Sequence, residues 1–102
     1  MTTFGDGSVF EAMIPVDNII LAKNAVEELF GITLIEHESS YYGHPYYLCK
    51  RGDETFYVKI NQDDEGQPLV SQFAAEAIIF QVVTTRARVT DYEGAFERRF
   101  TN

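Results

Sequence analysis

The stretch Tyr46-Tyr-Leu-Cys-Lys-Arg-Gly-Asp-Glu-Thr-Phe-Tyr-Val-Lys-Ile60 decides the fold, because it has the pattern of a β-hairpin. Two runs rich in aromatic and β-branched residues, 46–50 and 55–60, flank the turn residues 51–54. The hairpin predicts an antiparallel sheet. We expect one face of the hairpin to be buried and to carry Leu48, Phe56, Val58 and Ile60, and the opposite face to carry Tyr47, Cys49, Tyr57 and Lys59.

A helix is predicted ahead of the hairpin, over residues 19–30. Apolar side chains recur there at helical spacing on one stripe, and charged or amide side chains fall mostly on the other. Asp17 is a residue type that caps helix N-termini, and Gly31 stands where a C-terminal glycine belongs. Residues 32–35 are then expected to form a strand that leads into a polar segment.

Three further elements are expected outside this central region. Residues 9–14 alternate as a short strand does, and residues 77–85 are rich in β-branched side chains typical of a buried strand. Thr90 and Glu93 match a capping box, which predicts a short C-terminal helix that begins there. Residues 69–76 fit either a helix or a strand.

The whole chain, residues 1–102, is expected to be one α+β domain with a loose N-terminus over residues 1–8. We predict an antiparallel sheet of four or five strands, with an N-terminal and a C-terminal helix packed on one face. A chain of 102 residues can bury a modest core, and its 8 Phe and 6 Tyr supply large side chains for that core.

The charge of the chain restricts its partners. The net charge is −8, from 8 basic and 16 acidic residues, and the acids concentrate in the first two thirds of the chain. Nucleic acids and anionic membrane surfaces are bound through Lys and Arg, so direct binding to either is not expected. An acidic protein is instead attracted to a basic partner.

A cytoplasmic location is expected from the residues of the chain. Cys49 is the one cysteine, so an internal disulfide cannot form, which favours a reducing compartment. The first eight residues have neither the basic nor the apolar part of a signal peptide, and no apolar run approaches the roughly 20 residues of a membrane span.

The segment Glu36 to Tyr47 concentrates the titratable side chains of the protein, including both histidines. His37, His44 and Cys49 are metal-ligand types, but their spacing matches no common zinc motif. Cys49 with a histidine could supply a nucleophile and its base, but no nucleophile motif surrounds it. We therefore expect no catalytic residues, no cofactor and no metal, and keep a small-ligand or metal-binding domain as an alternative.

Recognition of a protein partner fits the polar segment better. Tyrosines offer large contact areas at low entropic cost, and acids and serines beside them suit a basic partner. A second acidic loop begins at Asn61; it departs from a calcium-binding loop because its twelfth position is Gln72. The predicted partner-binding residues are Glu36, Glu38, Ser39, Ser40, Tyr41, Tyr42, His44, Tyr47, Asp63, Asp64 and Glu65.

The runs Phe30-Gly31-Ile32-x-Leu34 and Glu36-His37-Glu38-Ser39-Ser40-Tyr41-Tyr42-Gly43, followed by Tyr46-Tyr47, resemble a pattern in small bacterial proteins of the toxin-immunity type. In these proteins a helix leads to a strand that ends in a similar turn and a hairpin. The resemblance spans about residues 25–60. It implies a non-enzymatic protein that binds and blocks a basic toxin or nuclease, and it assigns no role to individual residues.

The function expected from the sequence is therefore non-enzymatic binding. The chain would neutralise or regulate a basic protein partner by covering it with an acidic, tyrosine-rich surface. A homodimeric structural or assembly protein, joined through a spare sheet edge, is a further alternative, so the sequence leaves monomer and homodimer open.

Overall fold

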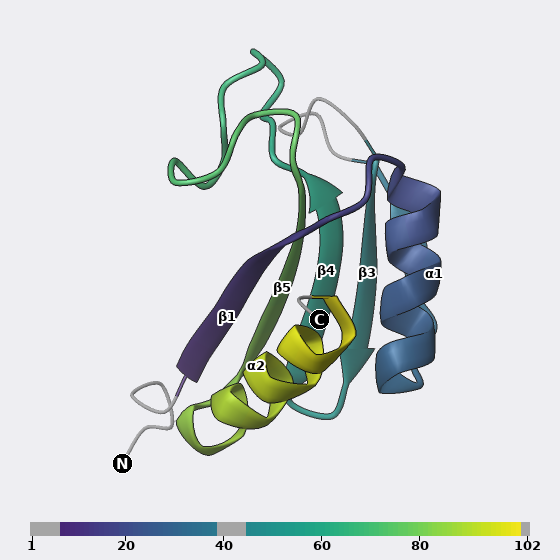
Figure 1. The fold of residues 1–102 in the computed structure, drawn as a ribbon, viewed down its shortest axis with the longest axis vertical. Helices are drawn as coiled ribbons and strands as arrows, with labels where there is room; N and C mark the ends of the chain where they lie inside the picture. Colours follow the sequence, from purple (N-terminus) through teal and green to yellow (C-terminus); the bar gives the residue numbers. More distant parts are fainter. Residues whose placement is uncertain (1–6, 39–44, 101–102) are drawn as a thin grey trace.

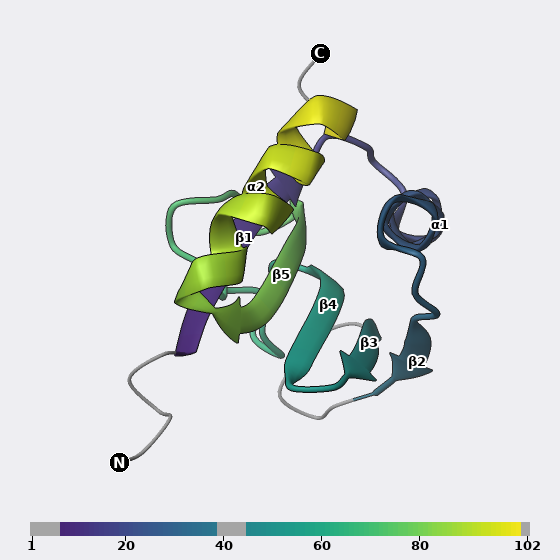
Figure 2. The ribbon, with the colours of Figure 1, turned by 90° about the horizontal axis from the view of Figure 1, so that it is seen from below.

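The computed structural model describes residues 7–38 and 45–100, which form a five-stranded antiparallel sheet and two helices (Figure 1). In chain order the elements are β1 (Gly7–Ile14), α1 (Ile19–Phe30), β2 (Ile35–His37), β3 (Tyr46–Arg51), β4 (Glu54–Ile60), β5 (Ile78–Thr85) and α2 (Arg86–Phe100). The strands lie in the order β1-β5-β4-β3-β2. Both helices cover the same face of the sheet (Figure 2), which confirms the predicted α+β fold.

The predicted hairpin is β3 and β4. Phe56 and Val58 of β4 are buried as expected, but the two faces of β3 are the reverse of those expected from the sequence. Arg51 lies opposite Glu54, so the turn consists of Gly52 and Asp53. The same register places Tyr47 opposite Val58. Since paired residues share a face, Tyr47 lies on the helix side with Val58, and its ring is only 6% exposed. The assignment of Leu48 to the buried face was wrong.

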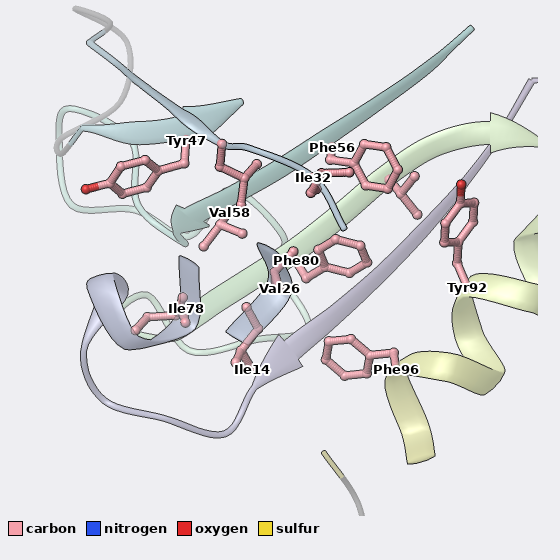
Figure 3. Packing of buried hydrophobic residues seen from close by; sticks show 13 residues of the cluster. Ile14, Val26, Ile32, Tyr47, Phe56, Val58, Ile78, Phe80, Tyr92 and Phe96 are labelled. Atoms are coloured by element: carbon pink, nitrogen blue, oxygen red, sulfur yellow. The ribbon is translucent and has the colours of Figure 1, made fainter. Parts of the chain in front are cut away.

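The core lies between the sheet and the two helices (Figure 3). Phe80, at the centre of β5, is fully buried. The Phe30 ring of α1 stacks on it with centroids 5.3 Å apart, and the Phe96 ring of α2 stacks on it at 5.7 Å. Burial of each such side chain contributes about 1.5–3 kcal/mol. Phe80 therefore helps to hold both helices on one face of the sheet.

Both helices differ from expectation at their N-terminal ends. The side chain of Asn18, not Asp17, caps α1 by accepting the backbone N–H groups of Ile20 and Leu21 at 2.8 and 3.2 Å. Gly31 ends α1 at φ +64°, as predicted. α2 begins at Arg86 rather than at Thr90, directly after β5.

Three other expectations are corrected. Gly7 and the residue after it belong to β1, so the loose N-terminus does not extend to residue 8. The strand expected at 32–35 is found at Ile35–His37 instead, because the Leu34 N–H donates to Glu27 Oε2 at 2.7 Å rather than to another strand. Residues 69–76 form turns. In the described part of the chain, neither helix has the length and apolar character needed to cross a membrane.

Candidate functional site

One end of the sheet gathers acidic residues from three separate segments. β1, β2 and β4 all end there, so the residues that follow or complete them, 15–18, 36–38 and 61–77, share that end, at the top of Figure 1. These segments contain no Lys or Arg. We call this region the acidic end, and its carboxylates are those of Asp17, Glu36, Glu38, Asp63, Asp64, Glu65 and Glu76. All of them are exposed except Asp63, which is half-buried.

The opposite end of the sheet carries positive charge. The end of β3 contributes Arg51, and the first turn of α2 contributes Arg86 and Arg88. Asp53, in the turn between β3 and β4, is exposed, whereas the neighbouring Glu54 is buried. The protein therefore has charges of opposite sign at the two ends of its strands. Such a distribution orients an approaching charged partner before contact.

The loop 61–77 carries four of the seven carboxylates and is held in place by Asn61, a role that the sequence did not predict. Asn61 is fully buried at the end of β4. Its side-chain nitrogen lies 3.0–3.1 Å from the carbonyl oxygens of Val70, Phe73 and Ala74. Its side-chain oxygen accepts the Val70 N–H at 2.7 Å. The side-chain amide of Asn61 thus binds backbone groups of the loop that have no partner in a helix or strand.

Asp63 shapes the tip of the same loop. Its Oδ1 accepts the backbone N–H groups of Glu65 and Gln67 at 2.8 and 2.9 Å. This is the local hydrogen bonding by which Asp stabilises turns. Asp64 and Glu65 are exposed beside it. Asp63 therefore has a structural role in the loop, and Asp64 and Glu65 are the carboxylates that a partner can reach.

The structure describes only part of the predicted polar surface. Glu36, in the edge strand β2, and Glu38, directly after this strand, are both exposed, as a recognition role requires. Ser39, Ser40, Tyr41, Tyr42 and His44 lie outside the described residues. The prediction that Tyr47 belongs to the surface was wrong, because its register buries it. The Lys23 Nζ lies over its ring, 5.7 Å from the centroid.

A site that combines His37 with Cys49 is incompatible with the sheet. His37 pairs with Tyr46, and their rings stack 5.6 Å apart on the face opposite the helices. Cys49 pairs with Phe56 on the helix side. The sheet therefore separates the two side chains. Among the described residues, no group of three or more His, Cys, Asp and Glu side chains could hold a metal ion.

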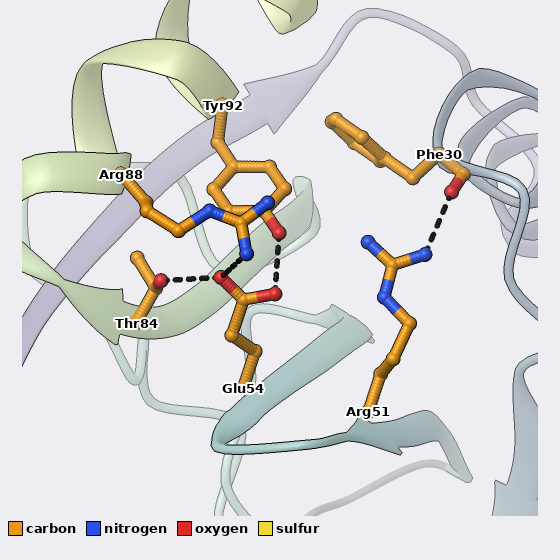
Figure 4. Close-up of polar contacts among 6 residues, drawn as sticks. All are labelled: Phe30, Arg51, Glu54, Thr84, Arg88 and Tyr92. Atoms are coloured by element: carbon orange, nitrogen blue, oxygen red, sulfur yellow. Dashed lines mark hydrogen bonds and ion pairs between the residues drawn. The ribbon is translucent and has the colours of Figure 1, made fainter.

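A buried polar cluster lies near the other end of the sheet (Figure 4). Glu54, 6% exposed, accepts the hydroxyl groups of Thr84 and Tyr92 at 2.6 Å each and pairs with Arg88 at 3.1 Å. Burial opposes ionisation of Glu54, but these hydrogen bonds and the charges of Arg88 and Arg51 outweigh it and lower its pKa. Through these contacts the cluster ties α2 to β4 and β5.

A second buried charge lies on the face opposite the helices. Lys59 is 8% exposed, and its Nζ donates to Gln81 Oε1 at 3.2 Å. The Gln81 side chain in turn donates to Glu11. Burial lowers the pKa of Lys59, and the Glu11 carboxylate acts in the opposite direction. This chain of contacts joins β4, β5 and β1 and gives the buried ammonium group of Lys59 a hydrogen-bond acceptor within the sheet.

The acidic end is thus the part of the described structure with the strongest features of a recognition site. It combines exposed carboxylates with a loop fixed by Asn61. The resemblance to toxin-immunity proteins stays a prediction. Comparisons with protein-family models, with curated proteins and with solved structures found no match for this chain, so the function of the acidic end is inferred from its own geometry.

Proposed function

We propose that this chain is a non-enzymatic binding protein that neutralises or regulates a basic protein partner in the cytoplasm. The observation that carries the proposal is the acidic end: seven carboxylates lie at one end of the sheet, and the segments that carry them contain no Lys or Arg. The mechanism is occlusion: the acidic end covers a basic surface of the partner, such as the substrate-binding surface of a toxin or nuclease. This matches the function implied by the resemblance to immunity proteins.

Electrostatics supports such a role chiefly through the rate of association. A unit charge 10 Å from another interacts by about 0.4 kcal/mol in water at low salt. Because seven carboxylates lie at the same end of the sheet, their summed attraction favours approach of a basic protein to that end by several times the thermal energy. The fixed loop 61–77 adds to this effect, because its carboxylates do not have to be ordered when the partner binds.

The proposal is tested with the basic protein that copurifies with the tagged wild-type chain from its native host. In one triple variant, Glu38→Gln, Asp64→Asn and Glu65→Gln remove three exposed carboxylates from the acidic end. At about 0.4 kcal/mol each, their loss should slow association about sevenfold at low salt. Surface plasmon resonance measures the rate constant.

A matched control removes the same total charge from the helices. Its substitutions, Glu28→Gln, Asp91→Asn and Glu93→Gln, also affect exposed side chains. We expect this control to slow association by less than about twofold, because its charges lie away from the acidic end. Equal effects of the two triple variants, or no copurifying basic protein, would contradict the proposal.

Assembly of two copies is a second candidate, favoured by the outer edge of β1. This strand is eight residues long and, among the described residues, pairs on one side only, with β5. An unpaired strand edge of this length is a template for addition of another strand. Light scattering at several concentrations distinguishes the two candidates: a monomer mass at all of them excludes the assembly.

A further inference from the structure

A shallow apolar groove of about 620 Å³ lies at the acidic end, between the connection from β1 to α1 and the start of β5. Its floor is formed by Ile14 and Ile78, which belong to the core. Met13, Val16 and Leu21 line its sides. The groove therefore exposes apolar side chains continuous with the hydrophobic core.

The side walls of the groove are unusually exposed for large apolar residues. Leu21 is 57% exposed and Met13 is 49% exposed, although the two come from different elements, α1 and β1. Single exposed apolar residues are common on protein surfaces, but a concave group over an apolar floor is typical of a binding site. A ligand that filled the groove would cover the exposed Leu21 side chain.

The rim of the groove is acidic. Asp17 is part of the lining, and Glu76 precedes the lining residue Ala77. Both acids are exposed. The groove is thus complementary to a segment that offers an apolar side chain next to a positive charge, and it repels an acidic segment or an anionic lipid headgroup.

We infer that the groove receives one bulky apolar side chain from a basic segment of the protein partner, with a neighbouring Lys or Arg facing Asp17. This inference rests on the proposed function and specifies the partner further: charge at the acidic end speeds its approach, and the groove slows its release. Full burial of a leucine-sized side chain strengthens binding by about 10- to 150-fold. The groove would therefore act as the anchor of the interface.

The test uses the synthetic peptide acetyl-Arg-Lys-Leu-Phe-Lys-Arg-amide as the probe and a matched pair of variants. Leu21→Ser removes a groove wall, whereas Ile20→Ser changes the preceding residue, which is 48% exposed and does not line the groove. NMR titration should show about a fivefold weaker Kd for Leu21→Ser and less than a twofold change for Ile20→Ser.

A second peptide separates apolar anchoring from charge alone. In acetyl-Arg-Lys-Ser-Ser-Lys-Arg-amide the charges are kept and the apolar side chains are removed, so we expect about a tenfold weaker Kd. Equal binding of the two peptides would overturn the inference. So would amide shifts that leave Val16, Leu21 and Ala77 unaffected, or equal effects of Leu21→Ser and Ile20→Ser.

The same variants, measured with the copurified partner, distinguish failure of the groove from failure of the proposed function. If neutralising Glu38, Asp64 and Glu65 slows association but Leu21→Ser leaves the dissociation rate unchanged, the groove inference fails and the proposed function stands. If neutralising these three acids has no more effect than the helix control, the proposed function itself fails. Slower association of the triple variant together with faster dissociation of Leu21→Ser supports both the proposed function and the groove inference.

Discussion

Replacement of Asn61 by Ala should open the loop 61–77 while the sheet stays folded. The Asn61 side chain has two N–H hydrogens, which are shared among three carbonyl oxygens, and one oxygen that accepts the Val70 N–H. The substitution thus removes about three hydrogen bonds. At about 1 kcal/mol net for each, the free energy of opening the loop falls by about 3 kcal/mol.

Hydrogen exchange of the Val70 amide measures this effect directly. A loss of about 3 kcal/mol corresponds to exchange about 150-fold faster than in the wild type. Amides of β4 and β5, such as that of Phe80, should change far less. Asn24→Ala is the matched control, because Asn24 is exposed on α1 and makes none of the loop contacts. Unchanged protection of Val70 in Asn61→Ala would refute the role assigned to Asn61.

Three further predictions concern the stability of the fold. Because its folded pKa is lowered, Glu54 contributes stability that is present above its unfolded pKa of about 4.5 and is lost as pH falls through the folded pKa. Glu54→Gln should therefore cost about 2 kcal/mol at pH 7 and flatten the dependence of urea unfolding on pH; an unchanged pH dependence would contradict this. Gly31→Ala should cost about 1 kcal/mol, since φ is +64° and the added Cβ meets no atom within 4 Å; in contrast, Gly94→Ala, in the helical part of α2, should stabilise by about 0.5–1 kcal/mol. If the melting temperature fell in both Gly31→Ala and Gly94→Ala, backbone conformation alone would not explain the effects. Asn18→Ala should cost about 1 kcal/mol in the same assay, whereas Asp17→Ala should be nearly neutral if Asn18 is the N-cap.

Local patterns in the sequence predicted most of the elements but not how their ends are fixed. The helix at 19–30 could be predicted because its signals are local: the apolar spacing lies within the helix, and Gly31 follows it directly. The start of α2 was misplaced because it depends on contacts between distant residues: Arg88, in its first turn, pairs with Glu54 from β4. No local signal at Thr90 contains that information.

In the candidate site, too, local features could be predicted from the sequence, whereas features that depend on distant residues could not. The acids of the loop were visible in the sequence, but their position at the same end of the sheet as Asp17, Glu36 and Glu38 follows from the order of the strands. The role of Asn61 could not be predicted, because its partners lie nine to thirteen residues further along an irregular loop. Tyr47 was misassigned for another reason: a change of one residue in strand alternation moves a side chain to the other face.

The most direct test of the central claim is the association rate of the wild-type protein with its copurified partner as a function of salt. Stopped-flow measurements between about 10 mM and 500 mM salt span Debye lengths from about 30 Å to below 5 Å. If the acidic end guides binding, the association rate constant should fall by at least about tenfold over this range, and the dissociation rate constant should change little. An association rate constant independent of salt would contradict the account.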